Sequence, residues 1–405
     1  MLARKVSNFH LCKNINRLGQ SVPVMDTVKM KDDLLSSILA IEQSIHSCKT
    51  IKIHHITSLD APFSNLGKGA YFYYRRLTLM RNLNALVESA PRNLHIIETI
   101  YKAHANLDRH LKCAISVSGG SDSDIVMDLI ELVKPDSCER VYVFFDTGLE
   151  YAATKRHLDE LEQKYGVSII HRKPRKTIPV VCREYGVPFI CKDVSDVMNR
   201  LQRHGFDWLD QPQNATEEKY GRCKSALDWY FSRRPLSSGG KSRHDINRFK
   251  LLREFIMVNA PDFSISDKCC DYAKKQTAED FNKEYRPDLV INGMRQAEGG
   301  RRAGSLQTCF SPRTDKNPDN YRPLWYWTDE DKAIYKEWRG IRYSDCYEVY
   351  GLKRTGCVGC PCNSKAEQEL TMVEPFEPQI IRAARSVFGA SYDYKRQYVE
   401  FKSKK

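Results

Sequence analysis

Long apolar segments are missing from this sequence. It has no apolar run of about 18 or more residues, the length that a membrane-spanning helix needs. It also lacks the GxxxxGK(S/T) phosphate loop and the GxGxxG dinucleotide fingerprint. Acidic residues are absent from positions 1–25, a composition found in transit peptides, but a soluble cytoplasmic protein is what we expect. These absences argue against a membrane-spanning helix and exclude two common kinds of nucleotide-binding loop.

Cysteine, in contrast, is abundant, with 14 residues in a chain of 405. Secreted disulfide scaffolds are much shorter and carry a signal peptide. In a reducing cytoplasm, clustered cysteines indicate metal binding or redox chemistry instead. No cysteine follows Cys362.

The charge balance is strongly basic, with a formal net charge of +13. Such a balance favours polyanionic partners, a nucleotide in the first place and DNA or tRNA in the second. A solvated basic face that serves only solubility is the alternative, because no named nucleic-acid-binding motif accompanies the charge. The basic residues gather at 172–176, 233–250 and 301–302 and near the C-terminus.

Short strands of the buried type alternate with helical segments from residue 112 onward. Alternation at this spacing is typical of a parallel sheet with helices on both faces. We therefore predict an α/β fold with a doubly wound, Rossmann-like parallel sheet. The strands are expected at 113–117, 141–145, 167–171 and 288–292, with helices at 125–132 and 154–165.

This pattern predicts that the chain has three parts. Residues 1–110 are expected to form a mainly helical N-terminal extension, because apolar residues recur there at three- and four-residue intervals. Residues 111–300 form the α/β domain, with an insertion at about 231–250 that is rich in Pro, Ser and Gly. Residues 301–405 form a Cys-rich C-terminal region that completes the site.

The segment Ser118-Gly119-Gly120-Ser121-Asp122-Ser123 lies between a predicted strand and a predicted helix. Glycines let the backbone approach an anion, the helix N-terminus presents N–H groups, and serine hydroxyls add donors. The segment therefore predicts a diphosphate-binding loop, with a Gly-Ser turn that holds no ligand as the alternative. Asp146-Thr147-Gly148 ends the next strand and is expected at the same edge of the sheet.

These residues resemble those of a known superfamily. SGGSDS is similar to the SGGxDS signature of the adenine-nucleotide alpha-hydrolase (PP-loop ATP pyrophosphatase) superfamily, and four further segments resemble its phosphoadenosine-phosphosulfate (PAPS) reductase family. The resemblance covers about 112–365 and implies ATP and Mg²⁺ as cofactors. Residues 1–110 match nothing that we know. The four segments are Asp146–Tyr151 with Thr154, Asn292–Glu298, Pro323–Tyr335 and Gly351–Pro361.

Four cysteines in a CC…CxxC arrangement, Cys269, Cys270, Cys357 and Cys360, form a second candidate site. Adjacent cysteines chelate one tetrahedral zinc ion awkwardly, whereas the separate irons of a [4Fe–4S] cluster accept neighbouring thiolates. The arrangement also resembles cluster-bearing adenylylsulfate (APS) reductases and the sulfur-transfer enzyme of DNA phosphorothioation (DndC). We expect a [4Fe–4S] cluster, with zinc or unmetallated cysteines as alternatives. Cys309 and Cys362 are spare thiols expected nearby, either of which could replace a ligand or accept sulfur.

Arginine and lysine side chains complete the predicted nucleotide site. Guanidinium groups grip phosphate in a bidentate manner, and Asp122 and Asp146 are candidate Mg²⁺ ligands. Lys268, Arg301, Arg302 and the segment 222–224 are further candidates. We assign the catalytic residues as Asp122, Ser123, Arg295, Lys353 and Arg354. We assign the nucleotide-binding residues as Ser118, Gly119, Gly120, Ser121, Asp122, Ser123, Asp146, Thr147, Gly148, Gly293 and Arg295.

Two reactions compete for this site. The resemblance implies that true reductases have a degraded loop and a catalytic cysteine in a C-terminal tail, and this chain has an intact loop and no such cysteine. We therefore favour ATP cleavage to an adenylate and pyrophosphate. The adenylate would serve sulfur transfer to DNA, tRNA or a small acceptor, with a cysteine desulfurase or another sulfur donor as partner. APS or PAPS reduction is the first alternative, and a degenerate nucleotide- or nucleic-acid-binding regulator is the second.

Overall fold

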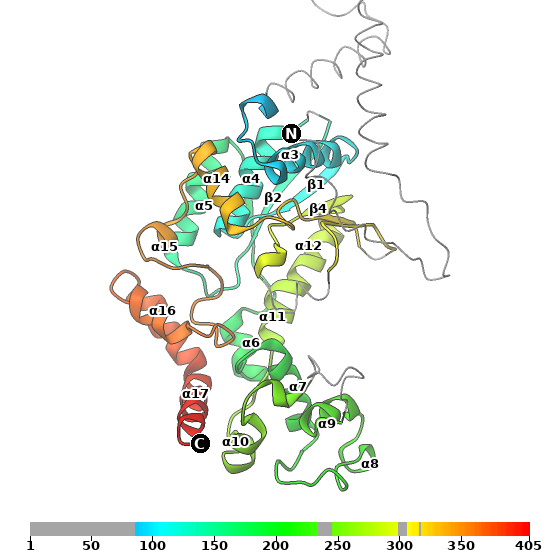
Figure 1. Ribbon diagram of the computed structural model, residues 1–405, viewed down its shortest axis with the longest axis vertical. Helices are drawn as coiled ribbons and strands as arrows, with labels where there is room; N and C mark the ends of the chain where they lie inside the picture. Colours follow the sequence, from blue (N-terminus) through cyan, green and yellow to red (C-terminus); the bar gives the residue numbers. More distant parts are fainter. Residues whose placement is uncertain (1–85, 136, 234–244, 299–305, 316) are drawn as a thin grey trace, which may run out of the picture. The chain divides into compact units, whose positions relative to one another are not determined.

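The computed structural model describes residues 86–135, 137–233, 245–298, 306–315 and 317–405, all of which belong to one compact unit, residues 75–405 (Figure 1). Most of the predicted N-terminal extension, Arg301, Arg302 and the centre of the predicted insertion lie outside the described residues. The first helix described in full, α3 (Leu94–Asp108), packs against α4 (Ser121–Val133). This end of the predicted extension therefore contributes to the core of the α/β unit.

A six-stranded sheet lies at the centre of the α/β part, with the strand order β3-β2-β1-β4-β6-β5. Five strands are parallel, and the edge strand β5 runs antiparallel to β6. Because β1 lies between β2 and β4, the carboxyl ends of these three strands meet at one edge. The strands are β1 (Lys112–Ser116), β2 (Glu139–Phe145), β3 (Ile169–Arg172), β4 (Leu289–Ile291), β5 (Phe310–Ser311) and β6 (Asp319–Tyr321).

Helices cover both faces of this sheet. Ile115 and Phe144 face one side, in a core that includes residues of α3, α4 and α14 (Asp329–Arg339). Ala114 and Val143, one residue away in each strand, face the other side and pack against Phe281 of α12 (Thr277–Tyr285). Figure 1 shows these helices on the two sides of the strands. The predicted α/β fold with helices on both faces is confirmed.

The chain between β3 and β4 is helical and has a core of its own. This core is rich in aromatic side chains and is closed on one side by the long C-terminal helix α17 (Pro378–Ser403), which contacts α6 and α10. None of the helices among the described residues is long and apolar enough to cross a bilayer. The helices here are α6 (Ile178–Tyr185), α7 (Lys192–Arg203), α8 (Glu217–Tyr220), α9 (Lys224–Tyr230), α10 (Leu252–Val258) and α11 (Lys268–Cys270).

The remaining helices position the site. They are α5 (Ala152–Tyr165), α15 (Asp345–Glu348) and α16 (Ala366–Val373), with a π-helix at Asp271–Gln276 and 3-10 turns at Ile246–Arg248 and Gln296–Glu298.

Gly186, which ends α6, generates a stability prediction. Its φ is +101° and ψ is 171°, a region that only glycine adopts readily, and a Cβ would lie 2.2 Å from the Ser264 carbonyl oxygen. Gly166 also has a positive φ, +63°, but a Cβ there would meet nothing within 4 Å. We expect Gly186→Ala to lower the free energy of unfolding by about 3 kcal/mol or more, and Gly166→Ala by about 1 kcal/mol. Urea titration followed by circular dichroism measures both; equal losses would contradict the clash.

Candidate functional site

A cavity of about 850 Å³ opens at the carboxyl edge of the sheet. Its walls are residues 116–118 and 120–123 at the end of β1 and after it, the end of β2, residues 292–295 after β4, one face of α14, and residues 353–356; the predicted Gly119 is not among them. The sheet topology explains this position, because the connections that leave neighbouring parallel strands diverge at their carboxyl ends. The predicted phosphate loop and the motif-bearing segments from the C-terminal half thus line one cavity.

The loop after β1 is closed by the Ser123 hydroxyl. That oxygen accepts hydrogen bonds from the backbone N–H groups of Ser118 (3.1 Å) and Gly120 (3.2 Å) and donates to the Gly120 carbonyl (2.8 Å). Both glycines are needed for space. A Cβ would lie 2.8 Å from the Thr154 Cγ2 atom at Gly119, where φ is +63°, and 2.9 Å from the Thr355 hydroxyl oxygen at Gly120. The 13-residue helix α4 then begins at Ser121.

Asp122, in the first turn of α4, is held by two cations. Its Oδ1 atom lies 2.6 Å from the Lys332 Nζ atom and 2.9 Å from the Arg295 Nε atom. Arg295 is buried and also pairs with Asp329 at 2.8 Å, and Lys332 donates to the Ser121 hydroxyl at 2.9 Å. The structure thus brings the predicted residues Asp122, Ser121 and Arg295 together with a lysine that sequence reasoning missed.

The position of Lys332 depends on the residue before it, Asp331. Asp331 caps α14, where its carboxylate accepts hydrogen bonds from the Thr328 backbone and from His95. Burial opposes ionisation of this carboxyl, but His95, Thr328 and Asn93 hold its pKa at about 2. The cap fixes the start of α14, and Lys332 in its first turn then faces the phosphate loop. The charge pattern alone did not show which lysine of this helix points inward.

Tyr347 joins the loop to the segment that carries Lys353 and Arg354. Its hydroxyl oxygen accepts hydrogen bonds from the backbone N–H groups of Ser121 (3.2 Å) and Thr355 (3.1 Å). Burial raises the pKa of Tyr347, so the hydroxyl stays protonated. Lys353 and Arg354 are exposed and line the cavity. Nothing in the sequence pattern indicated this bridge, because it joins residues 226 positions apart.

Asp146, Thr147 and Gly148 follow β2 as predicted, but the cavity wall is formed by their neighbours Phe145 and Glu150. Asp146 pairs with the Lys155 Nζ atom at 2.8 Å and accepts a hydrogen bond from the Gly148 N–H at 3.0 Å. Burial opposes ionisation, yet these two donors hold the pKa of Asp146 below its ordinary value. The Thr147 hydroxyl donates to Glu150 and lies 3.9 Å from the Cys357 sulfur. This segment therefore connects the cavity to the cysteines.

Three of the four cysteines, Cys269, Cys270 and Cys357, belong to one apolar core between α6, α16 and α17, and Cys360 lies in the turn that follows Cys357. Cys269 is buried and the other three are half-buried. Burial, with the negative charges of Glu150, Cys360 and Cys270, raises the pKa of Cys357 to about 12. A hydrogen bond from Cys362 lowers the pKa of Cys360 to about 7. Within the described ranges, no three His, Cys, Asp or Glu side chains are arranged around the position of a single metal ion.

Lys274 lies between the Cys357 thiol and the cavity. It was not identified from the sequence. It lies in the π-helix that follows Cys270, a kind of distortion that is frequent at functional sites. Its side chain lines the cavity, and the Cys357 sulfur together with Glu150 raises its pKa. A single cavity therefore extends from the phosphate loop to the neighbourhood of the cysteines.

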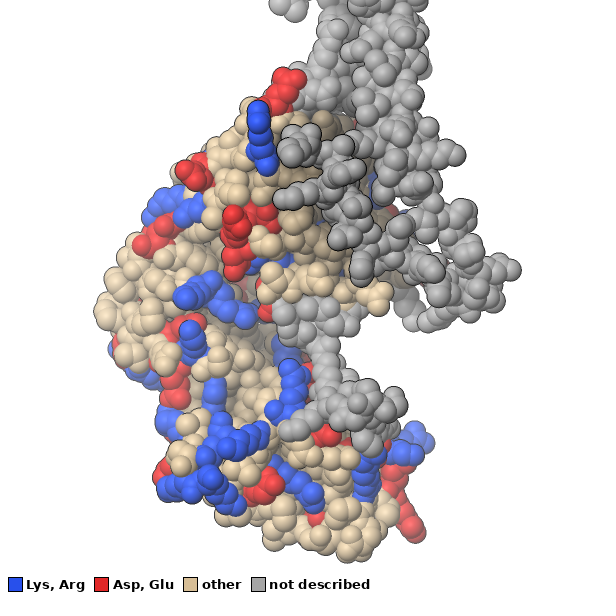
Figure 2. Space-filling view, viewed as in Figure 1, with Lys and Arg blue, Asp and Glu red and all other residues tan. Residues whose placement is uncertain are grey.

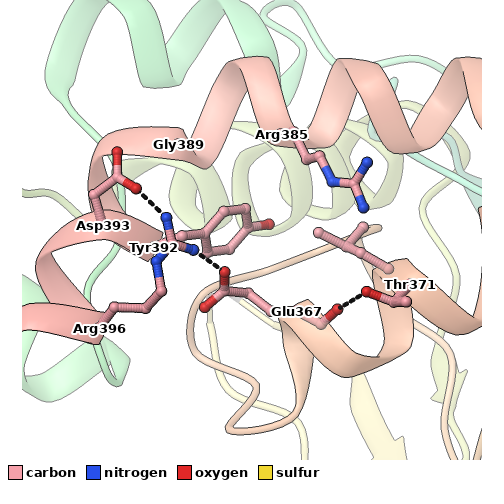
Figure 3. Close-up of a pocket in the computed structure, with 8 residues that line it drawn as sticks. Glu367, Thr371, Arg385, Gly389, Tyr392, Asp393 and Arg396 are labelled. Carbon is pink, nitrogen blue, oxygen red and sulfur yellow. Dashed lines mark hydrogen bonds and ion pairs between the residues drawn. The ribbon is translucent and has the colours of Figure 1, made fainter. Parts of the chain in front are cut away.

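Tyr392 of α17 supports the CxxC turn from behind. Its hydroxyl donates a hydrogen bond to the Gly359 carbonyl, which lies between Cys357 and Cys360. Figure 3 shows Tyr392 in a second hollow of about 310 Å³, between Arg385 and Arg396. Arg396 forms ion pairs there with Glu367 and Asp393, so the charges of this hollow are largely satisfied by one another.

Two expectations are corrected. Cys309 was expected near the four cysteines, but it precedes β5 at the far edge of the sheet, and its carbonyl accepts a hydrogen bond from the Arg322 N–H at 2.7 Å. Arg222-Cys223-Lys224 was a candidate part of the site, but Cys223 is buried at the start of α9 in the separate helical core. Lys268 is half-buried and pairs with Asp271 at 3.4 Å.

Fold and cavity together define an α/β protein with a ligand cavity at the carboxyl edge of a parallel sheet. The family model described as "Phosphoadenosine phosphosulfate reductase domain" matches residues 112–197, from β1 through the first half of α7. Over these residues the α/β unit is similar to that family domain.

Relatives similar in sequence are uncharacterized proteins. One is a 37.8 kDa protein of Escherichia phage 186, which is 25% identical over 301 residues, 70% of this chain and 80% of that protein. Another, from Methanocaldococcus jannaschii, is 35% identical over 74 residues, 18% of this chain and 15% of that protein.

The solved structures that are similar to this chain share little sequence identity with it. The PAPS reductase of Candida auris, in a phosphate complex, is 13% identical with a TM-score of 0.33 and covers 72% of this chain and 96% of that one. The U34-tRNA thiolase NcsA of Methanococcus maripaludis, with its [4Fe–4S] cluster, is 12% identical with a TM-score of 0.34 and covers 75% and 80%. The FMN adenylyltransferase of Candida glabrata is 10% identical with a TM-score of 0.36 and covers 71% of each chain.

The Tyr347 bridge generates a prediction that needs no ligand. Tyr347→Phe removes the acceptor of two backbone N–H groups, and each lost hydrogen bond costs about 1 kcal/mol. We expect the amides of Ser121 and Thr355 to exchange with solvent about fivefold faster, with little change in global stability. Hydrogen exchange read by mass spectrometry or NMR measures this. Tyr343→Phe, a neighbouring ring in the same wall, is the control, and equal acceleration in both variants would refute the bridge.

Proposed function

We propose that this protein is an enzyme that binds ATP with Mg²⁺ and cleaves it between the α- and β-phosphates. The observation that carries the proposal is the closed loop at Ser118–Ser123, which opens helix α4 into the cavity next to Arg295 and Lys332. Backbone N–H groups at a helix N-terminus and two cations are the donors that a pyrophosphate leaving group requires. Lys353 and Arg354, which line the same cavity, would hold the α-phosphate or the acceptor.

Each residue of the loop has a role in this reaction. An oxygen nucleophile attacks the α-phosphorus, the bond to the bridging oxygen breaks, and pyrophosphate leaves with its charge held by the loop, Arg295 and Lys332. Asp122 fits a Mg²⁺ ligand, because it is a carboxylate whose buried Oδ1 atom receives no directed hydrogen bond. Mg²⁺ at this position would neutralise phosphate charge. Ser123 keeps the loop closed, because its hydroxyl oxygen accepts the N–H groups of Ser118 and Gly120.

Sulfur chemistry at the other end of the cavity completes the proposal. Cys269, Cys270, Cys357 and Cys360 fit the donor set of a [4Fe–4S] cluster. A tetrahedral zinc ion held by the same thiolates is the alternative. A cluster would hold or deliver an activated sulfur atom. Lys274 and Glu150 line the passage from there to the phosphate loop.

The acceptor that fits the surface best is a nucleic acid, DNA or tRNA. The chain carries a net charge of +13, and Figure 2 shows Lys and Arg side chains gathered over α17 and the helices next to it. Polyanions bind such surfaces through their phosphates. A cysteine desulfurase or another sulfur donor in the cytoplasm would supply the sulfur, and a small molecule is the alternative acceptor.

The loop residues provide the first test of this function. We expect Asp122→Ala and Ser123→Ala each to lower the release of AMP and pyrophosphate from ATP at least 100-fold, because loss of a preorganised electrostatic contact costs about 3 kcal/mol. Product analysis by chromatography, with tRNA and DNA as acceptors, measures the rate, and circular dichroism checks the fold. Unchanged rates in both variants would show that the loop is not the catalytic cradle. Release of sulfite from APS or PAPS instead would support the reductase alternative.

Metal analysis provides the second test. We expect anaerobically purified protein to contain about four iron and four sulfide, and serine at any of the four cysteines to lower iron content by more than half. Cys309→Ser is the matched control, because Cys309 packs near β6 and should leave the iron unchanged. One equivalent of zinc without iron would overturn the cluster assignment.

A further inference from the structure

Two cations share a single carboxylate oxygen in the phosphate loop. Lys332 Nζ and Arg295 Nε lie 2.6 and 2.9 Å from the same atom, Asp122 Oδ1. The side chains of Lys332 and Arg295 are 14% and 7% exposed, so solvent screens these contacts weakly. One negative charge therefore partly neutralises the two most buried cations that face the loop.

The geometry of this triad is incomplete. Asp122 Oδ1 and Arg295 Nε are both buried, and neither takes part in a directed hydrogen bond. A buried polar atom without a hydrogen-bond partner is costly. The contacts among Asp122, Lys332 and Arg295 are thus short, but their angles are unfavourable for hydrogen bonds. Such contacts are easily replaced when a ligand binds.

The remaining contacts of the two cations hold them in place without neutralising them. Lys332 donates to the neutral Ser121 hydroxyl, and Arg295 donates at 3.3 Å to the Trp327 carbonyl. The other acid that pairs with Arg295 is Asp329, whose side chain is 90% exposed. An ion pair that is so exposed to solvent contributes little to stability. Asp122 is accordingly the group that offsets the positive charge at the loop.

We propose that Asp122 is an internal competitor of phosphate, which couples binding of a divalent cation to binding of the phosphate chain. Without ligand, its carboxylate occupies Lys332 and Arg295. When a divalent cation takes the carboxylate, both side chains are released toward the β- and γ-phosphates. The inference rests on the proposed function, since it concerns the same loop, but it adds a specific order of charge exchange.

This mechanism makes a prediction opposite to that of a simple metal-ligand role. Removing the charge of Asp122 should tighten the binding of a phosphate chain in the absence of metal, because both cations become free, although turnover is lost. If Asp122 served only as a metal ligand, its removal would leave metal-free binding unchanged. The sign of the change at Asp122 therefore decides between the two.

The experiment measures inorganic pyrophosphate binding by isothermal titration calorimetry on the full chain, with EDTA and with excess Mg²⁺. We expect Asp122→Asn to bind metal-free pyrophosphate at least tenfold more tightly than the wild-type protein. We also expect Mg²⁺ to improve wild-type affinity at least tenfold and that of the variant less than twofold. Asp122→Ala should show the same changes, which would exclude an effect of the amide that Asp122→Asn introduces. Lys332→Met should lose at least tenfold with and without Mg²⁺.

Asp329→Asn is the matched control, because it removes an acid that contacts the same arginine but is open to solvent. Its metal-free affinity should change less than twofold. Metal-free binding to both Asp122 variants that is no tighter than to wild type overturns the inference, even if wild-type protein cleaves ATP. If wild-type protein binds neither pyrophosphate nor ATP with Mg²⁺, the proposed function fails together with it.

Discussion

The parallel pairing of β1 between β2 and β4 is the constraint on which the rest of the structure depends. Ser116 pairs with Val143, and Ile115 with Ile291, so β1 and β4 end within one residue of each other and β2 continues two residues beyond β1. The strands then lead into three different segments, which are the phosphate loop, the Asp146 turn and the Gly293-Met294-Arg295 segment. Without this register, Arg295 could not reach an acid in the first turn of α4.

The C-terminal part of the chain is joined to this edge by specific polar contacts. The Glu377 carboxylate accepts hydrogen bonds from the Ala152 (2.7 Å) and Ala153 (2.9 Å) N–H groups at the start of α5 and from the Tyr350 hydroxyl (3.0 Å). The Val358 N–H donates to the Leu149 carbonyl at 3.0 Å. A negative group at a helix N-terminus is favourable. These contacts place the CxxC segment against the turn after β2, so the two ends of the cavity form one site.

The sequence was sufficient for strands β1 to β4 and for the position of the loop, because both depend on local signals: buried strands, glycines, and a helix that begins immediately afterwards. It did not indicate β5 and β6, which have only two and three residues. It was insufficient for Lys332 and Tyr347, whose contacts with the loop span more than 200 positions. It placed Cys309 wrongly, since counting thiols does not show that β5 lies at the far edge of the sheet. Lys274 depends on a π-helical turn, which has no sequence signature.

The turn between Cys357 and Cys360 shows how a distant helix determines a motif. At Gly359 φ is +66°, and a Cβ would lie 2.5 Å from the Tyr392 hydroxyl oxygen and 3.1 Å from both Ala384 and Leu370. The packing of α16 and α17 behind the turn therefore requires glycine inside CxxC, whether or not a metal is bound. A side chain at position 359 would need smaller residues at positions 370, 384 and 392, and its backbone would still be strained at this positive φ.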